Sequence, residues 1–351
     1  MNTLLKSATI IDPESTFHRQ VSDILIADGR IAKIAQTIEA GDNFNTVTLN
    51  NLHVSRGWWD SSVCFGEPGF EERETLENGL ATAAKSGFTD VAVQPDTHPV
   101  SDSRPDIAFL RSKAAGNAVN LYPVGALTLQ SKGEHLAELY DMQNGGAVAF
   151  GDYKKPVTNP GILKIALQYA QGFDGLVCSF PQENNIAGSG VVNEHIAATQ
   201  LGLKGIPTLA EALQVARDLF ILEYTEGKLH IPTISTAAAV ELIGNARKKG
   251  LNVSCSVAIH NLLFTDAVLR EFDTNFKVLP PLRTEADRYA LIDGLNQGII
   301  DFATTDHCPV NIEHKKTVFD HALYGTTGLE SAFGALHNLF GTEKTVELLT
   351  R

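Results

Sequence analysis

Short apolar segments alternate with amphipathic segments from Trp58 almost to the end of this sequence. The apolar segments end in polar residues, and the amphipathic ones have helical spacing and often end in glycine. The strand-like segments are GFTDVAVQPDT, NAVNLYPVGALT, GAVAFGDY, GLVCSFPQ, KLHIPTIS, LNVSCSVAIH and GIIDFATTDHCP. The helical ones include ETLENGLATAAKSG, ILKIALQYAQG, LAEALQVARDLFILEYTEG, STAAAVELIGNARKKG and EADRYALIDGLNQG.

With the segment at Trp58, these patterns make about eight strand–helix units, which predicts a TIM-type (β/α)8 barrel. The alternative is a doubly wound open sheet. That fold is less well supported, because no glycine-rich phosphate loop follows the first strand. The sequence therefore predicts an α/β barrel domain over residues 57–351.

Residues 1–56 have a different pattern, with short strand-like pieces separated by turns. The Asp28-Gly29 pair between ILIA and RIAKIA predicts a β-hairpin. We expect these residues to form a small β segment that precedes the barrel.

The charge and the cysteines limit the possible functions. A net charge of −13 argues against binding to nucleic acid or to an anionic membrane, since both need a basic surface. The sequence has neither a membrane-spanning apolar run nor a signal peptide, so we expect a cytoplasmic protein. The cysteines are widely spaced and form no CxxC pair, which favours four buried thiols: Cys64, Cys178, Cys255 and Cys308.

In a barrel of this type the chemistry lies where the strands end. The residues expected at those ends are Ser62, Cys64, the Gln94-Pro95-Asp96 stretch, Asp152, Phe180, Thr233, His260, Asp306 and His307.

At these positions the sequence resembles the dihydroorotases of the amidohydrolase superfamily. The likeness covers nearly the whole chain, with EPGFEERETLENGLATAAKSGFTDVAVQPDTHP, GAVAFGDYKKPV, IAGSGVVNEHIAATQLGLKGIPTLAEALQVARDL, HIPTISTAAAVELI, PPLRTEADRYALIDGLNQGIIDFATTDHCP and GTTGLES. The resemblance implies a barrel with a small β-sandwich built from both chain ends. Because the sequence stops at ELLTR, the C-terminal half of that sandwich is expected to be missing from it.

The resemblance also implies a zinc-dependent activity in pyrimidine biosynthesis, the hydrolysis of the cyclic amide of dihydroorotate or its closure from carbamoyl-aspartate. Zinc would generate a hydroxide and polarise the amide carbonyl. On this resemblance Asp152 is the retained bridging carboxylate, and Asp306 is the retained metal-site aspartate and general base.

The histidine ligands implied by the resemblance are replaced in this sequence. Ser62 and Cys64 stand at the first two positions, Phe180 at the third and Thr233 at the fourth. Of these residues only a cysteine thiolate is a good zinc ligand. We therefore predict that the metal site of the family is lost.

The positions that bind the substrate carboxylate in the family are also altered. Gly66 stands in place of an arginine and Asp96 in place of an asparagine, whereas His307 is kept. Asp96 would repel the substrate carboxylate unless it has a new cationic neighbour.

These changes predict a catalytically inactive protein, a pseudoenzyme, with no zinc expected. Its role would be structural or regulatory, with aspartate carbamoyltransferase as a partner implied by the resemblance, and we expect a homo-oligomer. The alternative is an active dihydroorotase or another cyclic amidohydrolase with an altered zinc site, in which Asp306 is the general base and Asp152 a ligand.

Three further hypotheses concern the same end of the barrel. His230, His260 and His307 would form a replacement metal site, the cysteines a thiolate site, or Cys64 a nucleophile helped by His307 or Asp306. The structural interpretation of each is a set of hydrogen-bonded or buried side chains. The charged run at residues 71–74 is interpreted as a solvated helix start that also lies near the entrance to the site.

Overall fold

The computed structural model describes residues 2–39 and 44–350 of the chain. Its centre is an eight-stranded sheet in the order β15-β14-β13-β10-β9-β8-β7-β6, in which the neighbouring strands pair in parallel. A parallel bridge between Val63 and His307 joins the two edges of this sheet. The sheet is therefore a closed barrel, which confirms the predicted fold class.

The barrel strands coincide with the eight apolar segments of the sequence. They are β6 (Trp58–Val63), β7 (Phe88–Val93), β8 (Asn120–Gly125), β9 (Ala149–Phe150), β10 (Val177–Cys178), β13 (Leu229–Ile231), β14 (Val253–Ala258) and β15 (Phe302–Thr304).

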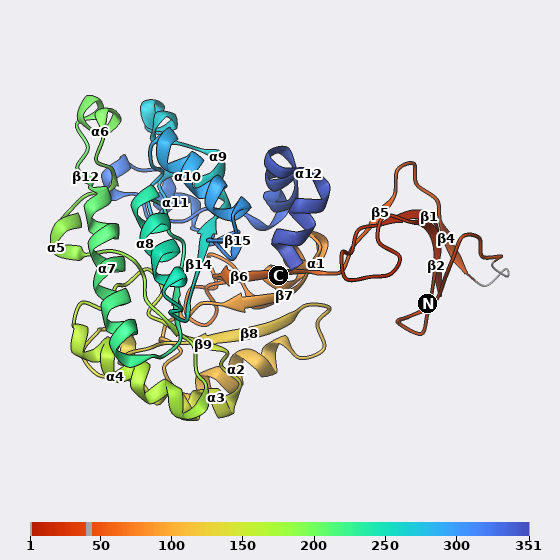
Figure 1. Ribbon diagram of the computed structural model, residues 1–351, viewed down its shortest axis with the longest axis horizontal. Coiled ribbons are helices and arrows are strands. Elements are labelled where there is room, and N and C mark those ends of the chain that lie inside the picture. Colours follow the sequence, from red (N-terminus) through yellow and green to blue (C-terminus); the bar gives the residue numbers. More distant parts are fainter. Residues whose placement is uncertain (1, 40–43, 351) are drawn as a thin grey trace.

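Helices surround the strands on the outside of the barrel (Figure 1). They are α1 (Leu76–Lys85), α2 (Arg104–Ala114), α3 (Leu139–Gly145), α4 (Pro160–Ala170), α5 (Asn184–Ala187), α6 (Ile196–Leu201), α7 (Thr208–Thr225), α8 (Ala237–Lys248), α9 (Ile259–Leu263), α10 (Glu285–Asn296), α11 (Ile312–Lys315) and α12 (Ala332–Thr350). Two short strands, β11 (Val192–Asn193) and β12 (Gly205–Ile206), pair in parallel outside the barrel.

Side chains alternate along the strands, and this alternation separates the core from the site. Leu229 and Ile231 of β13 are buried in the large core cluster of strand and helix side chains. His230, between them, lines the interior of the barrel instead. Local signals place the helices: Thr75 caps α1 through the Asn78 backbone N–H, and Thr284 with Asp287 forms a capping box at α10.

The N-terminal residues form a separate five-stranded sheet with β3-β2-β1-β4 in order and β5 paired to β1. The strands are β1 (Thr3–Ile10), β2 (Val21–Ala27), β3 (Arg30–Ala35), β4 (Asn45–Val47) and β5 (His53–Val54). The predicted hairpin is present, because Asp28 and Gly29 lie between the antiparallel strands β2 and β3 with positive φ.

This sheet lies beside the barrel, on the side where α12 is found (Figure 1). A two-pronged ion pair between Arg19 and Glu343 of α12 connects the two parts, with N–O distances of 2.6 and 2.7 Å. No helix among residues 2–39 and 44–350 is both long and apolar enough to span a membrane.

Candidate functional site

A cavity of about 300 Å³ occupies the interior of the barrel and reaches the C-terminal ends of the strands. Five of the residues expected at the strand ends line this cavity: Ser62, Gln94, Asp152, Phe180 and Thr233. The structure therefore brings together positions that are far apart in the sequence. Lys154 and Tyr153, which were not among the expected site residues, also line the cavity.

The two carboxylate oxygens of Asp306 have different partners at the rim of this cavity: an ion pair at Oδ2 and two hydrogen bonds at Oδ1. The Lys154 ammonium lies 2.8 Å from Oδ2. The Tyr153 hydroxyl donates to Oδ1 at 2.9 Å, and the Ser62 hydroxyl donates to the same oxygen at 3.3 Å. The Asp306 carboxylate, which is 1% exposed, is thus neutralised by an ammonium group of the same chain.

The surroundings of Lys154 favour its charged form. Burial, the largest single cause, lowers the pKa of Lys154, but the charge and hydrogen bond of Asp306, together with Cys308 and Cys64, raise that pKa above its ordinary value. Burial and the same carboxylate raise the pKa of the Tyr153 hydroxyl well above its usual range. Tyr153 is therefore a neutral donor, and Lys154 is the cation at this site.

Asp152 binds a neighbouring loop. Its two carboxylate oxygens accept hydrogen bonds from the Thr128 backbone N–H at 3.0 Å and from the Thr128 hydroxyl at 2.5 Å. Burial raises the pKa of this carboxyl group, although these hydrogen bonds act in the opposite direction. Asp152 thus has a structural role that requires no metal.

Phe180 and Thr233 place no strong ligand in the cavity. Phe180 packs in a small apolar cluster with Ala187, Ile206, Ala210 and Leu279. Thr233 has a left-handed backbone, with φ of 48°, and its N–H donates to the Ser256 hydroxyl. A β-branched residue rarely adopts this conformation, which shows that the surrounding strand ends impose it.

Lys154 and Asp306 share this unusual backbone, with φ of 55° and 48°. Three cavity-mouth residues are thus held in the left-handed region at a cost of about 1–3 kcal/mol each. The surrounding structure therefore fixes the backbone conformation at the mouth of the barrel, even at positions whose side chains offer no metal ligand.

These contacts decide whether zinc fits the position that the resemblance implies. A catalytic zinc needs about three protein ligands in tetrahedral array. Here Asp306 is paired with Lys154, Asp152 is bonded to Thr128, and Phe180 presents an apolar ring. A divalent cation beside Asp306 would also face the Lys154 ammonium. The residues at this position do not fit the metal.

Asp96 has a cationic neighbour, Arg73. Its guanidinium Nη1 lies 3.7 Å from Asp96 Oδ2, and it stacks on the Phe70 ring, 3.9 Å from the centroid. Gly66 has φ of +79°, and a Cβ at this position would lie 2.5 Å from the Phe70 carbonyl oxygen. The turn at Gly66 therefore leaves no room for a longer side chain in its present shape.

His307 is bonded away from the cavity. Its Nε2 lies 2.9 Å from Glu74 Oε2, and its Nδ1 accepts the backbone N–H of Gly328. Both His307 and Glu74 are buried. The interpretation of residues 71–74 as a solvated helix start is therefore wrong in two respects. Helix α1 begins only at Leu76, after this run. Glu74, its last residue, is not solvated, because its carboxylate reaches the interior and binds His307.

The three histidines proposed as a replacement metal site have separate environments. His230 hydrogen-bonds the hydroxyls of Ser254 and Ser256 and stacks on Phe302. Burial, with a smaller contribution from Arg247, lowers its pKa to about 4. His260 lies in α9, and in the described part of the chain its buried Nε2 has no hydrogen-bond partner. The structure gives no support to a histidine metal site.

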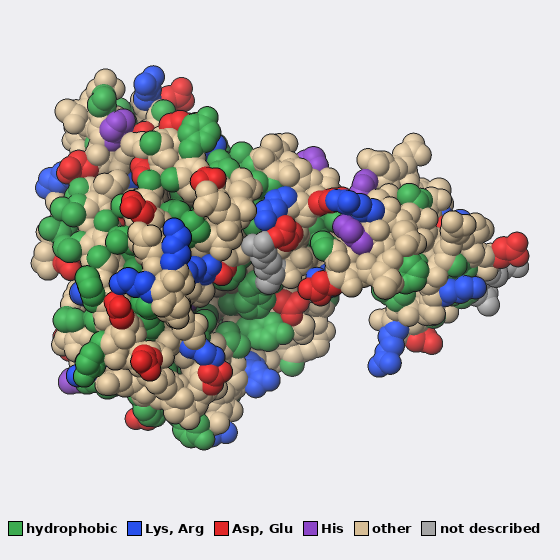
Figure 2. Space-filling model, in the orientation of Figure 1, with side chains coloured by type: hydrophobic (Ala, Val, Ile, Leu, Met, Phe, Trp, Pro, Cys, Tyr) green, Lys and Arg blue, Asp and Glu red, His purple; other side chains and the backbone are tan. Residues whose placement is uncertain are grey.

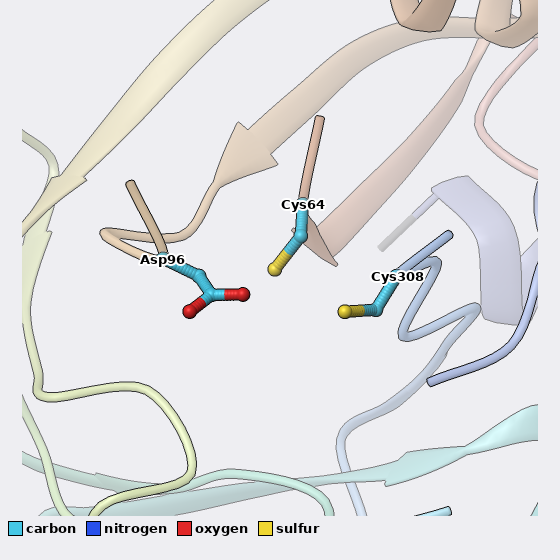
Figure 3. Close-up of side chains that lie close together, drawn as sticks. All are labelled: Cys64, Asp96 and Cys308. Atoms are coloured by element: carbon cyan, nitrogen blue, oxygen red, sulfur yellow. The ribbon is translucent and has the colours of Figure 1, made fainter. Parts of the chain in front are cut away.

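The cysteines divide into a pair and two single thiols. Cys64 and Cys308 converge with Asp96 into one group, and all three ligand atoms lie within 4.8 Å of one another (Figure 3). Cys178 lines the cavity, and Cys255 is buried in the core with its thiol 3.4 Å from the Ile299 carbonyl oxygen. The four cysteines therefore do not form one cluster, and only Cys64 and Cys308 lie together.

The two paired thiols have pKa values that are shifted in opposite directions. Burial, and then the neighbouring Cys308, raise the pKa of Cys64 well above its usual value. A hydrogen bond from Cys64 and the charge of Lys154 lower the pKa of Cys308 despite its burial. Cys308 is therefore the thiol that loses its proton first.

Lys154 and Tyr153 are the functional side chains that reasoning from the sequence missed. Both follow Asp152 directly in AFGDYKK, at the end of a barrel strand. A lysine within two residues of a strand-end aspartate was an available signal, because such a position faces the mouth of the barrel.

A family model described as dihydro-orotase-like matches residues 54–239. The dihydroorotase of Pelotomaculum thermopropionicum is 42% identical over 339 residues, which cover 95% of this chain and 78% of the relative. The dihydroorotase of Geobacter metallireducens is 39% identical over 333 residues, with the same two coverages.

This chain belongs to the dihydroorotase-like family. The membership confirms the lineage inferred from its motifs, a dihydroorotase-type amidohydrolase. Solved structures agree with the dihydroorotase-like fold. The L-hydantoinase (dihydropyrimidinase) from Arthrobacter aurescens superposes with a TM-score of 0.81 at 20% identity, over 99% of this chain and 80% of that one. The D-hydantoinase from Thermus sp. gives 0.79 over the same shares.

Proposed function

We propose that this dihydroorotase-like protein does not hydrolyse dihydroorotate and acts instead as a structural or regulatory partner of another protein in pyrimidine biosynthesis. The observation that carries the proposal is the buried ion pair of Lys154 with Asp306. A general base must be free to accept a proton from water. Asp306 is instead neutralised by an ammonium group and bonded by two hydroxyls.

Two further features support the absence of this activity. The carboxylate of Asp96 stands near the entrance, where it would repel an anionic substrate unless Arg73 fully compensates it. The phenyl ring of Phe180 reduces the polarity of the cavity at a position where the resemblance implies a metal ligand. Binding of the substrate, and of a metal at the position of Phe180, are thus both disfavoured, for independent reasons.

A surface of α7 supports a role in assembly. Leu209, Leu213, Phe220 and Tyr224 are spaced by four, seven and four residues, so they form one stripe along the helix. Phe220 is 72% exposed and Tyr224 is 71% exposed. Hydrophobic side chains are visible on the flank of the barrel where α7 lies (Figure 2). An exposed apolar stripe of this kind is typical of a protein–protein contact.

We propose aspartate carbamoyltransferase as the partner that covers this stripe. The proposal extends the resemblance to the dihydroorotases, among which inactive chains assemble with that enzyme. The co-purification test is a tagged form of this chain with the carbamoyltransferase from the same organism. We expect a stable complex that is lost in a Phe220→Ser, Tyr224→Ser double variant. Tyr289→Ser on α10, where Tyr289 is 60% exposed, is the matched control. A complex unaffected by the double variant would place the contact elsewhere.

The second candidate is an active cyclic amidohydrolase with an altered metal site. The comparisons favour it more than they favour inactivity, since the relatives described above are named dihydroorotase. The convergence of Cys64, Asp96 and Cys308 supplies an alternative set of metal ligands.

One assay separates the two candidates. Dihydroorotate hydrolysis and carbamoyl-aspartate cyclisation are measured on reduced protein, with and without one equivalent of zinc. We expect no turnover above the buffer rate in either condition. Turnover that disappears in Asp306→Asn would establish the enzyme and refute our proposal. The Lys155→Met variant, which changes an exposed lysine next to the site, controls for general effects of substitution.

A further inference from the structure

We propose that Cys64, Asp96 and Cys308 form a binding site for one soft divalent cation, with Zn²⁺ as the preferred ion. The site lies beside the position at which the family resemblance places its metals. Among the three residues, only Cys64 stands at a ligand position that the resemblance implies. The inference does not depend on the proposed function. A metal held here would serve equally as a structural ion in an inactive protein or as the centre of an enzyme.

The three side chains come from the segments that follow three barrel strands, and they point toward one another (Figure 3). Cys64 directly follows β6, Asp96 follows β7, and Cys308 follows β15. Their sulfur and carboxylate atoms converge on one space (Figure 3), with all ligand atoms within 4.8 Å of each other. The ligand atoms of a tetrahedral zinc lie roughly 3.5–3.8 Å apart. A contraction of about 1 Å, within reach of side-chain rotation, brings them to that geometry.

The backbone beneath these side chains is rigid. The Cys64 N–H donates to the His307 carbonyl at 2.7 Å, at the seam where the barrel closes. The Cys308 N–H donates to the Thr326 carbonyl at 2.8 Å, and the Gln94 N–H, close to Asp96, donates to the Val63 carbonyl at 2.9 Å. Because all three backbone segments are fixed, ordering the ligands costs little entropy when the ion binds.

The donor set is suited to zinc. Two thiolates and one carboxylate are three protein ligands, and they leave a fourth tetrahedral position for water. Thiolate sulfur selects soft or borderline ions such as Zn²⁺ over Mg²⁺ and Ca²⁺, which prefer oxygen ligands. Each thiol releases its proton to solvent as the sulfur–metal bond forms.

The surrounding charges balance such a centre. Two thiolates and Asp96 carry three negative charges, so a bound Zn²⁺ leaves one net negative charge. Lys154 and Lys315 both interact electrostatically with Cys308, and Arg73 lies 3.7 Å from Asp96 Oδ2. These cations compensate the remaining charge without acting as ligands, because none of them can donate a lone pair while protonated.

The test measures metal content and coordination rather than activity. Reduced, metal-stripped protein is titrated with Zn²⁺ and, in a parallel experiment, with Co²⁺, whose sulfur-to-metal charge-transfer band reports thiolate ligation. We expect one equivalent of tightly held Zn²⁺ and a charge-transfer band for Co²⁺. Cys64→Ser and Cys308→Ser should each weaken zinc binding by more than about tenfold and reduce the band.

Asp96→Asn should weaken binding while leaving the sulfur band in place, because both thiols remain. Cys178→Ser and Cys255→Ser are the matched controls and should bind the metal like the wild type. Circular dichroism establishes whether each variant is folded. If a cysteine variant does not fold, the weaker zinc binding expected for Asp96→Asn still tests the site.

No stoichiometric binding to the reduced wild type would overturn the proposal, as would binding unchanged in Cys64→Ser or Cys308→Ser. A Cys64–Cys308 disulfide that persists under reducing conditions, detected by mass spectrometry, would also contradict it. If zinc binds here and dihydroorotate is not hydrolysed, both proposals hold. If zinc binds and supports a turnover that Cys64→Ser abolishes, the site stands and the proposed lack of activity is refuted.

Discussion

Two adjacent regions at the mouth of the barrel differ in whether their potential metal ligands are already bonded within the chain. In the first, which we call the inner pocket (Ser62, Asp152, Phe180, Thr233 and Asp306), hydrogen bonds and ion pairs from the same chain engage the carboxylates. In the second, the thiol corner (Cys64, Asp96 and Cys308), three ligand atoms converge on a common space.

The difference shows how a charged site is stabilised when it does not hold a metal. A buried carboxylate is costly unless a cation or several donors compensate it. In the inner pocket Lys154 supplies that positive charge permanently. In the thiol corner the two cysteines are neutral when protonated, and the one carboxylate, Asp96, is only partly buried and lies 3.7 Å from the Arg73 guanidinium. The thiols therefore need no permanent cation and remain available for an external one.

The largest effect should come from removing the cation of the inner pocket. Lys154→Met leaves Asp306 buried and unpaired, and we expect it to lower the free energy of unfolding by about 3–5 kcal/mol. Urea denaturation measures this change. Lys155→Met is the control and should have little effect.

The double variant Lys154→Met, Asp306→Asn should recover much of this loss, because no uncompensated charge remains. If Lys154→Met alone is as stable as the wild type, the ion pair is not what stabilises the inner pocket.

An intermediate effect should follow from acidification, through His230 below the inner pocket. The folded-state pKa of His230 is lowered to about 4 by burial, so between that pH and about 6.5 the unfolded chain binds the extra proton more readily. Stability is therefore complete above about pH 6.5 and decreases as the pH falls toward 4, by up to about 3 kcal/mol.

Denaturation at a series of pH values tests this slope. His230→Asn should reduce this slope, and His260, whose pKa burial also lowers to about 4, should keep the remainder. His135→Asn, at an exposed position, should leave the slope unchanged. If the dependence of the unfolding free energy on pH is unchanged in His230→Asn, another group is responsible for the acid sensitivity.

The smallest effect is expected at the edge of the thiol corner, where solvent screens the charges. Arg73→Gln removes the pairing with Asp96 and the stacking on Phe70, and it should cost about 1 kcal/mol or less. Because this contact is partly exposed, its contribution should also decrease with added salt. A loss comparable to that of Lys154→Met would mean that the corner is as strongly coupled as the inner pocket.

The strand ends were predictable from the sequence because barrel topology fixes which residues share the mouth. Ser62, Asp152, Phe180 and Thr233 meet in one cavity as expected, although they are separated by many residues in the chain. The sequence indicated that Asp96 would repel an anionic substrate unless a cation lay beside it, and the structure identifies the neighbouring cation as Arg73.

Other features could not be predicted because they depend on side-chain direction. His307 stands at a predicted site position, yet its ring turns to Glu74 and Gly328. Of the four cysteines, only Cys64 and Cys308 approach each other, because β6 and β15 are the strands that close the barrel. Spacing along the chain contains no information about that closure.

The sequence by itself determined the barrel, the N-terminal hairpin and the dihydroorotase lineage. These follow from periodicity and residue identity, which are local properties. Only the tertiary structure decided that Lys154 neutralises Asp306 and that two thiols and a carboxylate converge. Such contacts form between side chains whose orientation is set by packing across the closed sheet, and no local pattern encodes them.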